Sequence, residues 1–180
     1  EVGSNVLVRP LRMAICHADQ RYFQGARDPK VMKRKLPMAL IHECSGEVLF
    51  DPNSRFERGD RVVMVPNVPG DASDEIFENY AEGSGFLSSG LDGFMREVVA
   101  ISADRVVSCE GVDDLIAPIT EFVSVAVHAV NRFERAAHSE RSSIGIVGDG
   151  SLAYVLGCVL DVLLPEAKLT VVGHNREKLS

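Results

Sequence analysis

The sequence predicts an α/β protein with two parts, a compact β-barrel over residues 1–122 and the start of a parallel sheet over residues 123–180. Short β-rich runs separated by turn residues fill the first part, as in small barrels. From Asp113 to about Phe133, apolar residues recur at helical spacing. Beyond them, strand-like and helix-like stretches alternate, which is typical of a parallel sheet.

Composition limits the classes of function. The 180 residues are 46% hydrophobic and 25% charged, which indicates a soluble globular chain. The net charge of −7 disfavours nonspecific binding to nucleic acid or to an anionic membrane. The sequence shows neither a membrane-spanning apolar run nor a signal segment, and we expect a cytoplasmic protein. Because the chain opens at Glu1 without methionine and soon enters a strand, N-terminal strands are expected to be missing.

The four cysteines are scattered and form no Cys-x-x-Cys pair. A disulfide framework is therefore not expected, which also fits a reducing cytoplasm. Cys44, Cys109 and Cys158 are predicted to be buried as small hydrophobic residues. Cys16 alone has neighbours that indicate a site.

The first part is predicted to hold several short strands, at Val6–Pro10, Met13–Cys16, Glu47–Phe50, Arg61–Pro66, Gly93–Ile101 and Val106–Ser108. Residues 19–35 are predicted to be a polar loop, with Gly25 and Pro29 as breakers. This loop contains five basic residues, Arg21, Arg27, Lys30, Lys33 and Arg34. Either these side chains are simply solvated, or they form a rim that binds an anion. A long irregular stretch, residues 67–91, is predicted to be functional or disordered.

The second part contains a glycine-rich turn between a strand and a helix. Residues 142–147 are predicted to be a strand, residues 154–164 a helix and residues 168–173 the next strand. Residues 148–153 have the pattern Gly-x-Gly-x-x-Ala, whose bare backbone lets a pyrophosphate approach the helix N-terminus. The pattern therefore predicts a dinucleotide site at Gly148, Gly150 and Leu152.

A candidate metal site lies in the first part. An apolar run ends in the adjacent pair His42–Glu43, which could bind a metal or move a proton, although an isolated pair is more often a chance surface feature. Cys16 adds a thiolate, and the three side chains together supply ligand types suited to a catalytic zinc. Glu121 lies on an otherwise apolar segment, where a lone acid is costly unless it is paired or binds a metal. The alternative is that Glu121 faces solvent.

These motifs resemble the zinc-dependent medium-chain alcohol and polyol dehydrogenases, in which a cysteine, a Gly-His-Glu and a Gly-Asp-Arg-Val follow one another. The counterparts here are Cys16, His42–Glu43 and Gly59–Val62. The resemblance covers essentially the whole chain. It implies a GroES-like catalytic domain followed by a truncated Rossmann domain, with Cys16, His42 and Glu43 as catalytic residues and, together with Glu121, as zinc ligands. Relatives often hold a structural zinc by four cysteines in the long irregular stretch, but residues 67–92 contain none, so one metal is expected.

Two departures from this family concern the proton. Ala18 stands where many relatives have Ser or Thr, and Arg21 stands where many have a relay histidine. The usual hydroxyl-to-histidine relay therefore cannot operate, and Glu43 or a water on the metal would have to deliver the proton. Arg21 is predicted instead to hold a substrate phosphate, since guanidinium binds phosphate bidentately.

Within the family, the chain is most similar to bacterial enzymes that reduce a ketopentose phosphate. The shared segments are Val8–Leu11, Asp19–Tyr22, Lys35–Met38, Val65–Asn67, Ser88–Gly90 and Asp92–Met95. This similarity implies reduction of D-ribulose 5-phosphate to D-ribitol 5-phosphate for CDP-ribitol and teichoic acid or capsule synthesis. It also implies a ribitol-5-phosphate cytidylyltransferase partner and a homodimer. The alternatives are a polyol dehydrogenase acting on an unphosphorylated sugar alcohol, and an inactive truncated relic that binds zinc; the fragment alone is expected to be inactive.

The segment after the second strand of the cofactor domain predicts NADPH. Sites that prefer NAD usually place an acid at this strand end to hold the ribose 2′-hydroxyl. No acid stands at Gly173–His174, and Arg176 could pair with a 2′-phosphate there. The alternative is that Arg176 and Lys178 merely begin a solvated helix.

Overall fold

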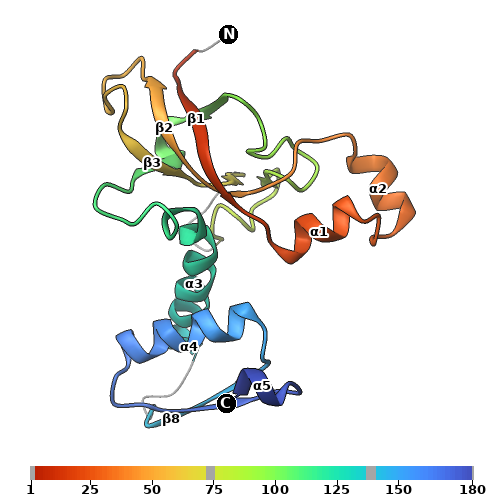
Figure 1. The fold of residues 1–180 in the computed structure, drawn as a ribbon, viewed down its shortest axis with the longest axis vertical. Coiled ribbons are helices and arrows are strands. Elements are labelled where there is room, and N and C mark those ends of the chain that lie inside the picture. The colour runs from red at the N-terminus through yellow and green to blue at the C-terminus, as the bar shows by residue number, and fades with distance from the viewer. Residues whose placement is uncertain (1–2, 72–75, 137–140, 180) are drawn as a thin grey trace. The chain divides into compact units, whose positions relative to one another are not determined.

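The structure is a computed structural model that describes residues 3–71, 76–136 and 141–179 (Figure 1). Contacts between residues divide the chain into two units, Glu1–Glu121 and Phe122–Ser180. Among the described helices, none combines the length and the apolar character that crossing a membrane requires.

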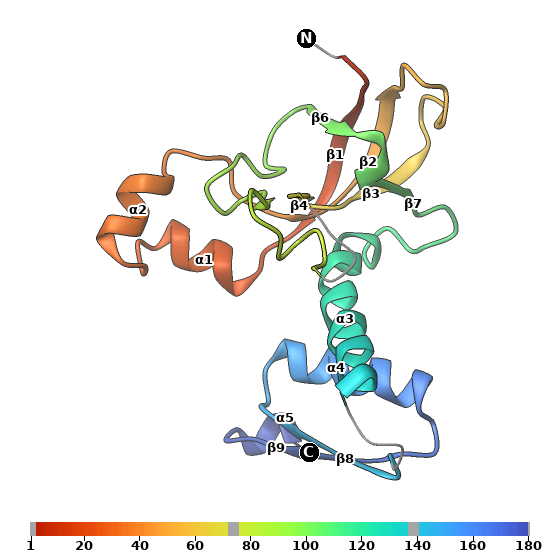
Figure 2. The ribbon, with the colours of Figure 1, turned by 180° about the vertical axis from the view of Figure 1, so that it is seen from behind.

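A five-stranded antiparallel sheet forms the frame of the first unit (Figures 1 and 2). Its strands, in spatial order, are β6 (Val99–Ser102), β1 (Asn5–Ala14), β2 (Glu43–Phe50), β3 (Arg61–Met64) and β7 (Val106–Ser108). In the part of the chain that the structure describes, this sheet curls into a half-barrel with β6 and β7 at its edges (Figure 1), which agrees with the predicted compact β-barrel. The predicted α/β class is confirmed.

Buried valine side chains line one face of this sheet. Val6 and Val8 of β1 are fully buried, as are Val48 of β2 and Val62 of β3. Side chains two residues apart on a strand point to the same face, and β-branched residues suit such a surface. The rest of this cluster consists of Cys44, Met64, Phe94, Val99, Ile101 and Val106.

The first strand is longer than predicted. The sequence predicts two extended pieces separated near Pro10, whereas β1 is one strand of 10 residues. Its pairing with β2 shifts register between Pro10 and Arg12. A bulge of this kind lets a proline sit within a strand without breaking it, so the prediction of an interruption was wrong.

Two helices occupy the segment predicted to be a polar loop. α1 (His17–Phe23) follows Cys16, and α2 (Pro29–Lys35) follows Asp28. The Asp28 carboxylate accepts a hydrogen bond from the Lys30 N–H at 2.7 Å. An aspartate cap followed by proline at the first helical position is a helix start. The loop prediction was wrong, because Pro29 begins a helix here and does not break one.

The remainder of the first unit differs in detail from the expectation. The long irregular stretch contains a short pair of strands, β4 (Asn67–Val68) and β5 (Gly85–Phe86), and its residues 72–75 lie outside the described part. The predicted strand at residues 93–101 is restricted to β6, which a short helix η1 (Ala103–Arg105) follows. The predicted helix begins later than Asp113: η2 (Ala117–Ile119) precedes α3 (Thr120–Ala136).

The second unit has the predicted strand, helix, strand order. β8 (Ser143–Val147) and β9 (Lys168–Val172) pair in parallel, with α4 (Ser151–Leu163) between them in sequence and α5 (Arg176–Leu179) after them. Val130, Ile146 and Leu160 form its buried cluster. Cys158 is exposed on α4, so the prediction that it is buried was wrong. Residues 137–140 and Ser180 lie outside the described residues.

Candidate functional site

The pairing of β1 with β2 brings Cys16 and His42 together. Ala14, the last residue of β1, lies opposite Glu43, the first residue of β2. Cys16 follows β1 by two residues, at the point where that strand leads into α1 (Figure 1), and His42 immediately precedes β2. Residues separated by 26 positions thus meet, with Cys16 Sγ 3.6 Å from His42 Nε2.

Asp19 lies beside both residues of this pair. It was not among the predicted site residues. Its Oδ2 atom accepts hydrogen bonds from the Cys16 N–H at 3.2 Å and from the Cys16 thiol at 3.0 Å. Its Oδ1 atom accepts from the Ile41 N–H and from the Ser88 hydroxyl, both at 3.0 Å. Burial opposes the ionisation of Asp19, but the bonds from Cys16 and Ile41 outweigh it and hold the pKa below its ordinary value. Asp19 is therefore a charged anchor for both strand ends.

Cys16 is protonated in this arrangement. Burial, and then donation of its thiol proton to Asp19, raise the pKa of Cys16 to about 11. A metal ligand must be the thiolate, and a bound cation supplies the charge that lowers a thiol pKa. Metal binding here would therefore release a proton.

His42 has the form that a metal requires. Burial lowers its pKa, with the Asp19 charge opposing, so the imidazole is neutral at pH 7. Its Nδ1 atom is buried, has no hydrogen-bond partner among the described residues and lies 3.9 Å from Asp19 Oδ1. The ring of Phe86 meets the imidazole edge-on at 5.2 Å. The imidazole ring therefore lies among Asp19, Cys16 and Phe86.

Two further carboxylates converge on His42. Ligand atoms of His42, Glu43 and Glu121 lie within 4.8 Å of one another, and so do those of Cys16, Asp19 and His42. Burial, followed by the charge of Asp19, raises the pKa of Glu43. Burial, followed by the charges of Glu43 and Asp19, raises the pKa of Glu121 to about 7. Acids crowded in this way repel one another, and a divalent cation would offset the repulsion.

The donor set therefore fits zinc. One thiol, one neutral imidazole and carboxylates are the ligand types that zinc uses in proteins. The structure brings the four proposed ligands into two overlapping clusters that share His42. Asp19, with its four hydrogen bonds, has the position of a residue that orients ligands.

The backbone around His42 is constrained. Ile41 has φ 70°, a conformation that β-branched residues adopt rarely. The Ile41 carbonyl accepts from the Phe94 N–H at 2.7 Å, and a Cβ on Gly93 would lie 2.3 Å from that carbonyl oxygen. The segment before His42 is thus held from two sides, by Asp19 and by residues 93–94. Strain that surrounding contacts maintain is common at functional sites.

Arg21 lies apart from the contacts that join this cluster. Its side chain is exposed, and its Nε donates to the Ala26 carbonyl at 3.2 Å, at the end of α1. Of the other predicted basic residues, Arg27 stacks over the Tyr22 ring at 4.1 Å, and Lys33 and Arg34 lie in the last turn of α2.

The proposed cofactor residues surround the turn between β8 and α4. Gly148 has φ 135° and donates its N–H to the Val172 carbonyl at 2.8 Å, and Gly150 is the N-cap of α4. Leu152 is exposed in the first turn of α4, and His174 and Arg176 are exposed after β9. Sequence reasoning missed Asp149, whose Oδ2 accepts from the backbone N–H groups of His174 and Asn175.

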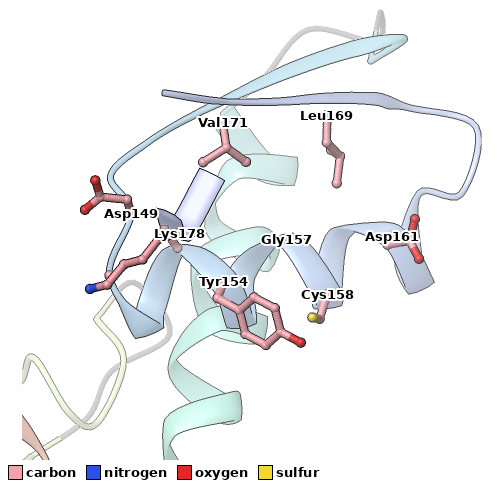
Figure 3. A pocket seen from close by; sticks show the side chains of 10 residues that line it. Asp149, Tyr154, Gly157, Cys158, Asp161, Leu169, Val171 and Lys178 are labelled. Carbon is pink, nitrogen blue, oxygen red and sulfur yellow. The ribbon is translucent and has the colours of Figure 1, made fainter. Parts of the chain in front are cut away.

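A pocket of about 560 Å³ lies between α4 and β9 (Figure 3). Asp149 and Lys178 stand at one end and Asp161 at the other, and much of the lining between them is apolar. In parallel sheets, ligands bind beyond the carboxyl ends of the strands, whereas helices cover the faces. The pocket borders a face, so the glycine turn at its end is the better candidate for the cofactor.

Comparison with known proteins agrees with this arrangement. Ribulose-5-phosphate reductase of Streptococcus pneumoniae is 52% identical over 98% of this chain, and ribulose-5-phosphate reductase 2 of Staphylococcus aureus is 49% identical over 99%. The chain spans 51% and 52% of the lengths of these two curated relatives. The crystal structure of S. aureus TarJ in complex with NADPH matches with a TM-score of 0.78 and 40% identity, covering 99% of this chain and 50% of that one.

The first unit also matches a known domain family. Residues 3–111 correspond to the alcohol dehydrogenase GroES-like domain, and this match covers more than half of the chain. The matched range contains Cys16, Asp19, His42 and Glu43. The chain belongs to the family of alcohol dehydrogenases that is defined by this GroES-like domain.

Proposed function

We propose that the full-length protein reduces D-ribulose 5-phosphate to D-ribitol 5-phosphate, with NADPH as the reductant and one catalytic zinc ion. The observation that carries this proposal is the meeting of Cys16 with His42, at 3.6 Å, together with the second cluster of ligand atoms that His42 forms with Glu43 and Glu121. The relatives named ribulose-5-phosphate reductase support the substrate. The NADPH complex of TarJ supports the cofactor.

We assign the zinc to Cys16, His42, Glu43 and Glu121. When bound, zinc acts as a Lewis acid that polarises a carbonyl, and NADPH supplies a hydride. Asp19 orients two of these ligands, because it binds the Cys16 backbone and thiol and lies beside His42 Nδ1. The ring of Phe86 meets the imidazole edge-on.

The proton for the new hydroxyl group is proposed to come from Glu43. Ala18 and Arg21 cannot form the hydroxyl-to-histidine relay of other family members. Glu43 is buried next to His42, and burial, followed by the charge of Asp19, raises the pKa of its carboxyl above the ordinary value, which is the direction that suits a general acid. Glu43 thus combines the features of a ligand and of a general acid.

The proposal also covers the boundary between the two domains, the cellular location of the protein and its binding partners. We place the catalytic domain at residues 1–122 and the start of the NADP-binding domain at residues 123–180. A cytoplasmic enzyme is supported by four free cysteines. A homodimer that passes its product to a ribitol-5-phosphate cytidylyltransferase follows from the family resemblance. Light scattering and co-purification of the full-length protein would test both associations.

A steady-state assay of the full-length protein tests the function. NADPH oxidation is followed with D-ribulose 5-phosphate and, in parallel, with D-ribulose, and the product is identified by mass. We expect kcat/KM to be much higher for the phosphorylated ketose. A preference for the free ketose would favour a polyol dehydrogenase, and no turnover with either would favour an inactive zinc-binding relic.

A further inference from the structure

Asp149 joins the two turns of the second unit. Its Oδ2 atom accepts hydrogen bonds from the His174 N–H at 2.5 Å and from the Asn175 N–H at 2.6 Å. The Gly148 N–H donates to the Val172 carbonyl at 2.8 Å. Three hydrogen bonds therefore fasten the end of β9 to the turn after β8. The conformation of residues 173–175 depends on a side chain that lies more than 20 positions earlier.

Gly173 leaves the space that Asp149 fills. A Cβ added at Gly173 would lie 2.5 Å from the Cβ of Asp149 and 2.6 Å from its Oδ2. Neither atom is the far end of a long flexible side chain, since the Asp149 carboxylate is held by two N–H groups. A side chain at position 173 and the Asp149 bridge therefore exclude each other.

This exclusion bears on the cofactor. An acid at the end of the second strand holds the ribose 2′-hydroxyl in sites that prefer NAD, and Gly173–His174 is that strand end. We propose that Asp149 is a positioning residue for the adenosine ribose: it fixes the backbone of His174 and Asn175 and excludes the strand-end acid. The inference rests on the proposed use of NADPH.

The charge of Asp149 does not oppose this role. The two N–H groups at Oδ2 stabilise the carboxylate, and the charge of Lys178 acts in the same direction. Figure 3 shows Asp149 and Lys178 at the same end of the pocket. A carboxylate whose charge is offset in this way repels a nearby phosphate less than an isolated acid would.

Fluorescence titration of the full-length protein with NADPH and with NADH tests this role through the two Kd values. Asp149→Ala removes the two charge-assisted hydrogen bonds. It should raise the Kd for NADPH by about tenfold and raise the Kd for NADH less. Asp149→Asn keeps an acceptor oxygen and should stay within about threefold of the wild type. Asp161→Ala, at the other end of the same pocket, is the control and should change neither Kd.

A second set of variants tests the exclusion. Gly173→Asp alone should raise the Kd of both nucleotides by at least about tenfold, because the turn at residues 173–175 must move to accommodate the new side chain. Asp149→Gly combined with Gly173→Asp should restore NADH binding and reverse the preference. Asp149→Ala combined with Gly173→Asp should not, because the Asp149 Cβ that blocks position 173 remains. These variants also carry the test if Asp149→Ala alone fails to fold.

The outcomes separate the two proposals. Wild-type protein that binds neither nucleotide would overturn both the proposed function and this inference. Wild-type protein that prefers NADPH, with that preference unchanged in Asp149→Ala, would overturn the inference alone. Tight NADH binding by Gly173→Asp without a second change would also overturn it. A larger loss of NADH than of NADPH in Asp149→Ala would make Asp149 a ligand of the 2′-hydroxyl instead.

Discussion

Oδ1 of Asp19 lies 3.9 Å from Nδ1 of His42, while the thiol of Cys16 lies 3.6 Å from the other ring nitrogen, Nε2. The same carboxylate accepts hydrogen bonds from the Cys16 N–H and from the Ile41 N–H. One buried carboxylate therefore lies beside two proposed zinc ligands, one just after β1 and the other just before β2.

Replacing Asp19 should weaken metal binding without removing a ligand. Asp19→Asn keeps acceptor capacity for the Ile41 N–H but loses the charge beside His42, and we expect zinc affinity to fall by about 10- to 100-fold. Competition with a chelator measures the change. Asp28→Asn removes the same charge from the cap of α2 and should leave the affinity unaltered, since Asn caps as well as Asp. Equal affinities in all three proteins would show that Asp19 has no orienting role.

The sequence indicates the ligands but not the residue that organises them. Cys16 and His42–Glu43 carry donor atoms, so their chemistry is visible in the sequence. Asp19 acts through hydrogen bonds to residues as distant as Ser88, 69 positions away, and only the folded chain reveals them. Asp149 is similar, since its partners His174 and Asn175 follow the next strand.

The fold shows the same division. Short β-rich runs between turn residues predict the sheet, and the glycine turn predicts the strand, helix, strand order, because both signals are local. α1 and α2 were missed because each has only 7 residues, too few for a clear periodicity. The conformation of Ile41, at φ 70°, depends on contacts with Asp19 and Phe94 and has no local signal.

The free energy of unfolding should depend on pH through Asp51, which lies in the turn between β2 and β3. Its carboxylate accepts from the N–H groups of Asn53, Arg55 and Phe56, and the Asn53 bond leads the causes that hold its pKa below the ordinary 3.8. A lowered folded pKa stabilises the protein above pH 3.8, and this contribution is lost as the pH falls through the folded value. Asp51→Asn should therefore unfold at lower urea concentration at pH 7. The difference should shrink below pH 3.8, and a gap that is constant with pH would exclude the electrostatic explanation.

Arg21 should distinguish phosphorylated from free ketoses. Its exposed guanidinium uses Nε for the Ala26 carbonyl, and a phosphate contact by the same group would be charge-assisted. Arg21→Ala should cost on the order of 1.5–3 kcal/mol in binding D-ribulose 5-phosphate and far less for D-ribulose. Lys30→Ala, on α2, is the charge-matched control. Equal losses for both ketoses would mean that Arg21 only supports the end of α1.

Arg176 should contribute to the choice of cofactor. It is the first residue of α5, two residues after His174 at the strand end that lacks an acid. Arg176→Ala should lower kcat/KM for NADPH by about tenfold or more and leave NADH nearly unchanged, because only NADPH carries the 2′-phosphate. Lys168→Ala, at the exposed opposite end of β9, serves as the charge-matched control. A wild-type preference for NADH would contradict the assignment.

The zinc content of the full-length protein tests the central claim most directly. Metal analysis after gel filtration should find one zinc per chain in the wild type and almost none in His42→Ala, because His42 belongs to both ligand clusters. Cys16→Ser should also lose zinc, together with the reduction of D-ribulose 5-phosphate. Two tightly held zinc ions per wild-type chain, or full zinc content and activity in His42→Ala, would contradict the proposed metal centre.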